Sequence, residues 1–147
     1  MEFKDEFNII KGEKVELKIL YRDEGDSEEI PYYYYGIFLE GNRKSIGKIS
    51  IRIGHNYHSY FNGNIGFEID EEYQGNHYAY EAAKLVIPVA KAHNMDYVII
   101  TCNKSNIASS KTIEKLGAKL IEIVDPPQDY LFYFEGIEPH KIYRLDI

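Results

Sequence analysis

The sequence lacks the features that mark several classes of protein. It contains a single cysteine, Cys102, so no disulfide can form within the chain, as is usual in a reducing compartment. No apolar run approaches the roughly 18 residues that a membrane-spanning helix needs. The N-terminal segment 1–7 is acidic and has no apolar core like that of a signal peptide. We therefore expect a cytoplasmic protein with no membrane partner.

Positive charge is also in short supply. There are 17 Lys and Arg residues against 24 Asp and Glu residues, and the net charge is −7 at pH 7. An acidic surface repels phosphate backbones, so we expect no nucleic-acid partner, whereas an amine-bearing ligand is favoured. The 147 residues are 44% hydrophobic and contain no repeat or linker, which predicts one domain over residues 1–147.

The first half of the chain shows the alternation of apolar and polar residues that is typical of strands. The expected strands are 14–21, 32–39, 45–53 and 64–70. The last three are joined by short links and should form an antiparallel meander. Segments 22–31 and 54–63 are expected to be connections.

From Gly75 the apolar residues recur at helical spacing, which predicts a long helix that ends near His93 and Asn94. Pro88 lies inside it and should kink it. The continuous apolar run 97–102 predicts a buried central strand. A second helix is expected at 106–116, followed by strands at 119–124 and 141–147. The order predicts an α/β (α+β) fold, with a mixed, mostly antiparallel sheet around a central strand–helix–strand core.

The turn at residues 73–79 has the features of an anion-binding site. The first N–H groups of a helix lack internal partners and lie at its positive end, and Gly75 would let an anion approach the backbone closely. Such a turn can hold a pyrophosphate. An ordinary strand-to-helix turn has the same features, so the residues alone leave both readings open.

The same turn resembles the acyl-coenzyme A signature of the GNAT superfamily of N-acetyltransferases, Arg/Gln-x-x-Gly-x-Gly/Ala. Gln74 matches its first position and Ala79 its last, while His77 replaces the middle glycine. Residues 103–117 resemble the second signature of that family, which has Asn and Ser at a helix start and closes with Glu-Lys-Leu-Gly. The resemblance covers roughly residues 30–124.

This resemblance implies that acetyl-coenzyme A is the co-substrate and that its acetyl group passes directly to an amine in a ternary complex. It also implies that the backbone of Phe67 and Ile69 lines the pantetheine arm, with one N–H polarising the thioester. The side chain of Gln74 would hold the pyrophosphate together with the backbone amides of Gly75, Asn76, His77, Tyr78 and Ala79. Asn106 and Ser109 would contact the far side of the cofactor.

Three positions leave the catalytic chemistry open. His77 either replaces glycine harmlessly, since a helix start needs no positive φ, or meets a phosphate with its imidazole. Ile113 stands where many family members have a tyrosine that protonates the leaving thiolate, although a thiol with a pKa near 8.5 can leave without a strong acid. Glu68 is the expected base for the amine; the alternative is that it faces solvent on an alternating strand.

The acceptor side departs from the family. Family members usually carry two helices where this chain has the short acidic segment 22–31, so the acceptor site is either open or completed by a second subunit of a homodimer. The acceptor, a small-molecule or peptide amine, is therefore not inherited. Two other functions compete with acetyl transfer: a non-catalytic module that binds coenzyme A, and a protein-interaction module on the same fold.

The remaining candidates are weaker. His55 and His58 have no neighbouring Cys or carboxylate, so we expect a flexible loop and no metal. Cys102 is expected to be a buried structural thiol. The aromatic stretch 130–134 lines an acceptor pocket, contacts another subunit or packs in the core.

Overall fold

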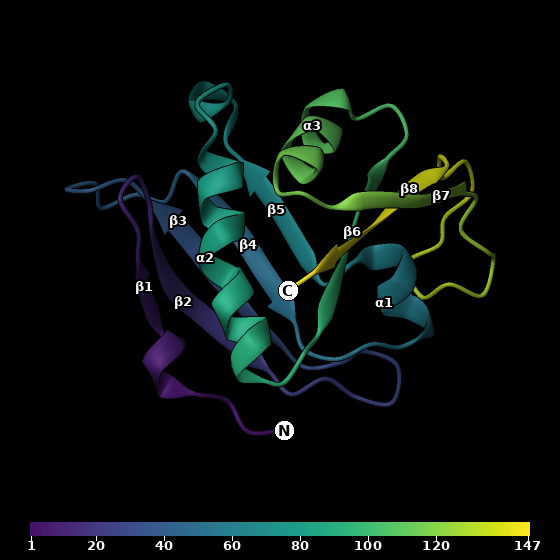
Figure 1. Cartoon of the computed structure of the whole chain (residues 1–147), viewed down its shortest axis with the longest axis horizontal. Helices are drawn as coiled ribbons and strands as arrows, with labels where there is room; N and C mark the ends of the chain where they lie inside the picture. The colour runs from purple at the N-terminus through teal and green to yellow at the C-terminus, as the bar shows by residue number, and fades with distance from the viewer.

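The computed structural model describes residues 1–147 and shows one eight-stranded sheet (Figure 1). The sheet has the order β1-β2-β3-β4-β5-β6-β8-β7, and only β5 and β6 pair in parallel. The strands are β1 (Ile9–Lys11), β2 (Glu16–Asp23), β3 (Tyr32–Phe38), β4 (Gly47–Arg52), β5 (Ile65–Ile69), β6 (Tyr97–Asn103), β7 (Lys119–Val124) and β8 (His140–Asp146). The predicted mixed, mostly antiparallel sheet and its β3–β4–β5 meander are confirmed.

Three helices and two short 3₁₀ turns complete the chain. They are α1 (Tyr57–Asn62), α2 (Tyr78–Ala92), α3 (Ile107–Lys115), η1 (Asp5–Phe7) and η2 (Glu71–Tyr73). The helix α2 connects the parallel strands β5 and β6, as the strand–helix–strand pattern predicts. None of the helices is long and apolar enough to cross a membrane.

The main hydrophobic core lies between α2 and one face of the sheet. Val86 and Val89 of α2 are fully buried in one cluster with Ile49 and Ile51 of β4. Each such side chain contributes about 1.5–3 kcal/mol when it is fully buried. Because neighbouring residues of a strand point to opposite faces, Ser50 and Arg52 of β4 lie on the face away from α2.

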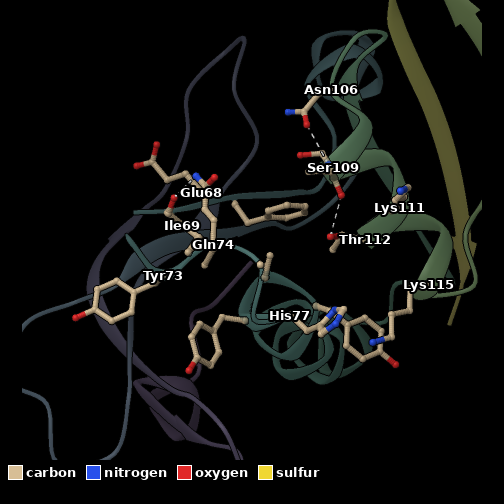
Figure 2. Close-up of a pocket in the computed structure, with 16 residues that line it drawn as sticks. Glu68, Ile69, Tyr73, Gln74, His77, Asn106, Ser109, Lys111, Thr112 and Lys115 are labelled. Carbon is tan, nitrogen blue, oxygen red and sulfur yellow. Dashed lines mark hydrogen bonds between the residues drawn. The ribbon is translucent and has the colours of Figure 1, made fainter. Parts of the chain in front are cut away.

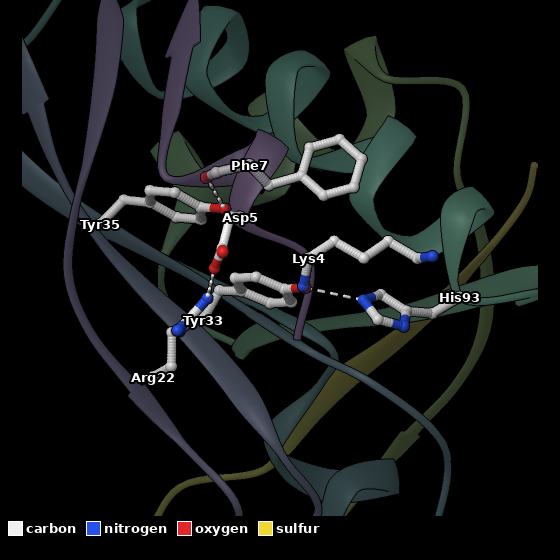
Figure 3. Close-up of polar contacts among 7 residues, drawn as sticks. All are labelled: Lys4, Asp5, Phe7, Arg22, Tyr33, Tyr35 and His93. Carbon is white, nitrogen blue, oxygen red and sulfur yellow. Dashed lines mark hydrogen bonds and ion pairs between the residues drawn. The ribbon is translucent and has the colours of Figure 1, made fainter. Parts of the chain in front are cut away.

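Two buried tyrosines of β3 connect the N-terminal segment to this core (Figure 3). The Tyr33 hydroxyl accepts a hydrogen bond from the backbone N–H of Lys4 (2.8 Å) and lies 2.8 Å from Nε2 of His93, at the end of α2. The Tyr35 hydroxyl donates to the carbonyl of Phe7 (2.8 Å). A buried hydroxyl is costly without a partner, so these bonds hold residues 4–7 against the sheet.

The structure differs from the sequence-based expectations at two places along this part of the chain. The expected connection 54–63 contains α1, which begins with a capping box between Asn56 and Ser59. Six residues are too few for a helical period to be visible in the sequence. The long helix begins at Tyr78 and not at Gly75, because Gly75 and His77 have positive φ. It runs on as an α-helix through Pro88 to Ala92, with His93 as its C-cap and Asn94 next, so it ends where expected.

A smaller apolar cluster covers β6 and β8 beside α1. Tyr130 is buried there, with its ring centroid 5.5 Å from that of Phe61. The ring of Phe134 is exposed. The two histidines near α1 are also engaged: His55 stacks on Tyr97, and His58 accepts a hydrogen bond from the Leu131 N–H. Nowhere in the chain do three or more His, Cys, Asp or Glu side chains gather as a metal site would require.

Candidate active site

A cavity of about 620 Å³ opens between β5, the start of α2 and one face of α3 (Figure 2). Its lining is Phe67, Glu68, Ile69, Tyr73, Gln74, Gly75, His77, Tyr78, Ala79, Tyr80, Asn106, Ala108, Ser109, Lys111, Thr112 and Lys115. The cavity therefore brings together every site residue predicted from sequence except Asn76. The Asn76 amide folds back onto its own loop and donates to the carbonyls of Tyr73 and Gln74.

The strand β5 presents free backbone groups to this cavity. It pairs with β6 only at Ile65 and Ile100, so the two strands diverge beyond that point. The N–H of Asp70 donates to the Ile46 carbonyl before β4. Because the direction of backbone bonding alternates along a strand, the N–H groups of Phe67 and Ile69 face the opening and not β4.

The loop before α2 is shaped by two left-handed residues. Gly75 has φ +84°, and a Cβ added there would meet no atom within 4 Å. His77, the residue just before α2, has φ +64°. The expectation that this position needs no positive φ is wrong: the backbone here keeps the conformation that a glycine adopts easily, although the residue is histidine.

Gln74 has a structural contact that the sequence does not indicate. Its Nε2 donates a hydrogen bond to the Ile69 carbonyl (2.9 Å). This bond connects the loop before α2 to the end of β5. One N–H of the amide remains available to a ligand, because a primary amide carries two donors.

Helix α3 supplies the other wall and the positive charge. Asn106 caps it, as predicted, by accepting a hydrogen bond from the Ser109 N–H (3.0 Å). Lys111 and Lys115 lie one turn apart on the cavity side, with the Lys115 ammonium 4.2 Å from the ring centroid of Tyr80. Sequence reasoning missed both lysines. Their spacing of four residues on the helix predicted to hold the cofactor was the available signal.

The expected base Glu68 and Ile113, which replaces the tyrosine of the family, lie in different surroundings. Glu68 is exposed and pairs in register with Lys48, so its side chain lies on the face of the sheet away from α2. Ile113 is fully buried in the main core and does not line the cavity. Cys102 is buried as well, and burial raises the pKa of its thiol, which makes it a poor nucleophile.

Replacing His77 with glycine should stabilise the protein. A left-handed conformation costs a residue other than glycine about 1 kcal/mol. We expect His77→Gly to raise the free energy of unfolding by up to about that amount, measured by urea denaturation, whereas His77→Ala should give no gain. A His77→Gly variant less stable than wild type would show that the imidazole makes a contact worth more than the strain.

Comparisons with known proteins agree on one family. The model of the acetyltransferase (GNAT) domain matches residues 11–119, and no protein of curated function matches the sequence. The ribosomal L7/L12 α-N-protein acetyltransferase RimL, in complex with coenzyme A, is 15% identical with a TM-score of 0.68, over 95% of this chain and 98% of that one.

Two further solved structures are similar over a smaller part of their length. The microcin C7 self-immunity acetyltransferase MccE, in complex with acetyl-coenzyme A and AMP, is 20% identical with a TM-score of 0.59, over 79% of this chain and 61% of that one. The ribosomal-protein-S5-alanine acetyltransferase from Vibrio fischeri is 23% identical with a TM-score of 0.62, over 78% and 61%. At these identities the likeness concerns the fold.

Proposed function

The chain belongs to the acetyltransferase (GNAT) family, and from that premise we propose that it transfers the acetyl group of acetyl-coenzyme A to an amine. The observation that supports this most is the cavity. It lies between α2, α3 and the part of β5 that diverges from β6, and it gathers both signature segments of the sequence. Its volume of about 620 Å³ is that of a site for a small molecule or cofactor.

The residues present fit a ligand that is anionic at one end. Backbone N–H groups around Gly75 and the start of α2 favour the pyrophosphate, with the free N–H of Gln74 beside them. Lys111 and Lys115 are suited to bind the phosphate group of coenzyme A that is not part of the pyrophosphate, because an ammonium group pairs well with phosphate oxygens. The N–H groups of Phe67 and Ile69, which face the opening, are free to bind the pantetheine arm.

The chemistry assigned to β5 is acyl transfer. An N–H of Phe67 or Ile69 stabilises the oxyanion that develops on the thioester carbonyl. Glu68 takes the proton of the ammonium acceptor, so that the neutral amine can attack. A C–N bond forms, the attacking nitrogen gives its second proton to solvent, and the C–S bond breaks. Coenzyme A leaves as the thiolate, which takes its proton from solvent, since Ile113 offers no hydroxyl.

Release of free thiol from acetyl-coenzyme A tests this function. We expect slow hydrolysis by the protein alone and a rise of at least about tenfold when a suitable amine is added, with N-acetylated product detected by mass spectrometry. A protein that binds acetyl-coenzyme A but never responds to any amine is a non-catalytic binding module. A protein that does not bind acetyl-coenzyme A at all is an interaction module on this fold.

A further inference from the structure

The face of the sheet away from α2 is where an acceptor can reach β5. In register on this face lie Tyr32 of β3, Ser50 and Arg52 of β4, and Gly66 and Glu68 of β5. The segment 24–31, which joins β2 to β3, contains no helix. The sheet face is therefore not covered by helices from that side.

Arg52 on this face has no polar partner for its guanidinium. The guanidinium takes part in none of the three ion pairs of the structure and donates none of its hydrogen bonds; the side-chain hydrogen bond at this residue runs from Nδ2 of Asn64 to the Arg52 backbone carbonyl (3.0 Å). The residue is half-buried. Its guanidinium nitrogens have no partner, yet the only polar side-chain atom that is both buried and without a partner is Oδ1 of Asn8. Each of these nitrogens therefore still reaches solvent. A half-buried guanidinium normally pairs with a carboxylate. Because the Arg52 guanidinium has no such partner, its five N–H donors are available to a ligand.

The guanidinium lies beside the reacting strand. Its Nη1 is 3.8 Å from the position of a Cβ added at Gly66, and its Cζ lies 5.5 Å from the ring centroid of Tyr32. Glu68 follows Gly66 by two residues on the same face, about 7 Å along the strand at 3.3 Å per residue. The Glu68 side chain thus starts about 7 Å along the strand from the residue beside which the guanidinium lies, a spacing comparable to the length of a small zwitterion with its hydrogen bonds.

From these positions we infer that the acceptor is a small amine that carries a carboxylate, such as a free α-amino acid, and that Arg52 binds its carboxylate while Glu68 faces its amine. This inference rests on the proposed acetyl transfer. Arg52 is a specificity-determining residue in this scheme, because guanidinium groups match carboxylates with two parallel hydrogen bonds.

The surrounding charge favours a zwitterion over a phosphate-bearing acceptor. Glu28 and Glu29 border a narrow crevice on one side of Arg52. The crevice has a volume of about 10 Å³ and so holds at most one water molecule. A doubly charged phosphate would be repelled by both carboxylates. The carboxylate of a zwitterion reaches the guanidinium from the Gly66 side. The ammonium group of the same molecule is attracted by the acidic residues nearby.

The test compares amino acids with their amides. We would measure thiol release from acetyl-coenzyme A with each of the twenty L-amino acids and with the matching L-amino acid amides. For the amino acid with the highest kcat/KM, the wild-type protein should have a kcat/KM at least about tenfold higher for the acid than for the matching amide. Most of this difference should come from a lower KM for the acid. Arg52→Gln should lower kcat/KM for the acid to that for the amide and leave the amide unchanged. Arg52→Lys should retain part of the preference.

Arg43→Gln is the matched control, because Arg43 is exposed and forms no ion pair, and it should keep the full preference. The inference is overturned if wild type uses acid and amide equally, if Arg52→Gln keeps the preference, or if that variant loses both substrates alike. If acetyl-coenzyme A does not bind, the proposed function fails separately. Calorimetric titration of the same acids and amides then tests Arg52 alone, and equal or absent binding overturns the inference.

Discussion

Gly75→Trp should weaken the binding of acetyl-coenzyme A by at least about a hundredfold, which corresponds to about 2.7 kcal/mol. Gly75 lines the cavity, and its Cα points into open space with no atom within 4 Å of an added Cβ. An indole there would occupy the volume assigned to the pyrophosphate and block the backbone N–H groups around it. Isothermal titration calorimetry measures the loss directly.

The control for this variant is Gly41→Trp. Gly41 also has positive φ (+74°) and open space around an added Cβ, but it lies in the turn between β3 and β4, away from the cavity. Both variants should lose about 1 kcal/mol of stability, because a left-handed position disfavours any side chain. Only Gly75→Trp should lose affinity. If both variants bind acetyl-coenzyme A like wild type, the anion site has been placed on the wrong loop.

Glu68→Gln should lower kcat by about a hundredfold or more while the affinity for acetyl-coenzyme A stays the same. General base catalysis contributes about 10²–10⁴ in rate, and the glutamine amide cannot accept the proton of the ammonium group. The defect should shrink as pH rises toward the pKa of the acceptor amine, because more of the amine is then neutral without help. A pH–rate profile of wild type and variant shows this convergence.

Glu72→Gln is the control, since it removes the same charge from an exposed residue close by that does not line the cavity. Its kcat should match that of wild type. If Glu68→Gln turns over at the wild-type rate across the pH range, the carboxylate only faces solvent, which is the alternative that the strand alternation leaves open.

Most of the fold follows from local pattern. The alternating isoleucines of β4 and the continuous apolar run of β6 place these strands within one or two residues, because burial on one or both faces controls both patterns. The strand β1, of three residues, and the helix α1, of six, were not predicted. Each is too short for its period to appear in the sequence, and α1 is specified by the cap at Asn56 and by packing on β6.

The candidate site was less predictable than the fold. The two signatures placed Gln74 and Asn106 on the cavity correctly, but not the hydrogen bond from Gln74 to the Ile69 carbonyl, which depends on the loop conformation. The positive φ of His77 was predicted wrongly, because a histidine gives no local sign of it. Arg52 was overlooked, because the absence of a partner is visible only when every neighbour is in place.

The most direct test of this account is the thermal stability of the wild-type protein with and without 1 mM acetyl-coenzyme A. A ligand at a hundred times its dissociation constant adds about 2.7 kcal/mol, which corresponds to a rise of roughly 5–15 °C in Tm for a domain of this size. We predict a rise of that order for wild type and for Gly41→Trp, and none for Gly75→Trp. No shift in wild type would contradict the account, since a member of this family without affinity for acetyl-coenzyme A cannot be an acetyltransferase.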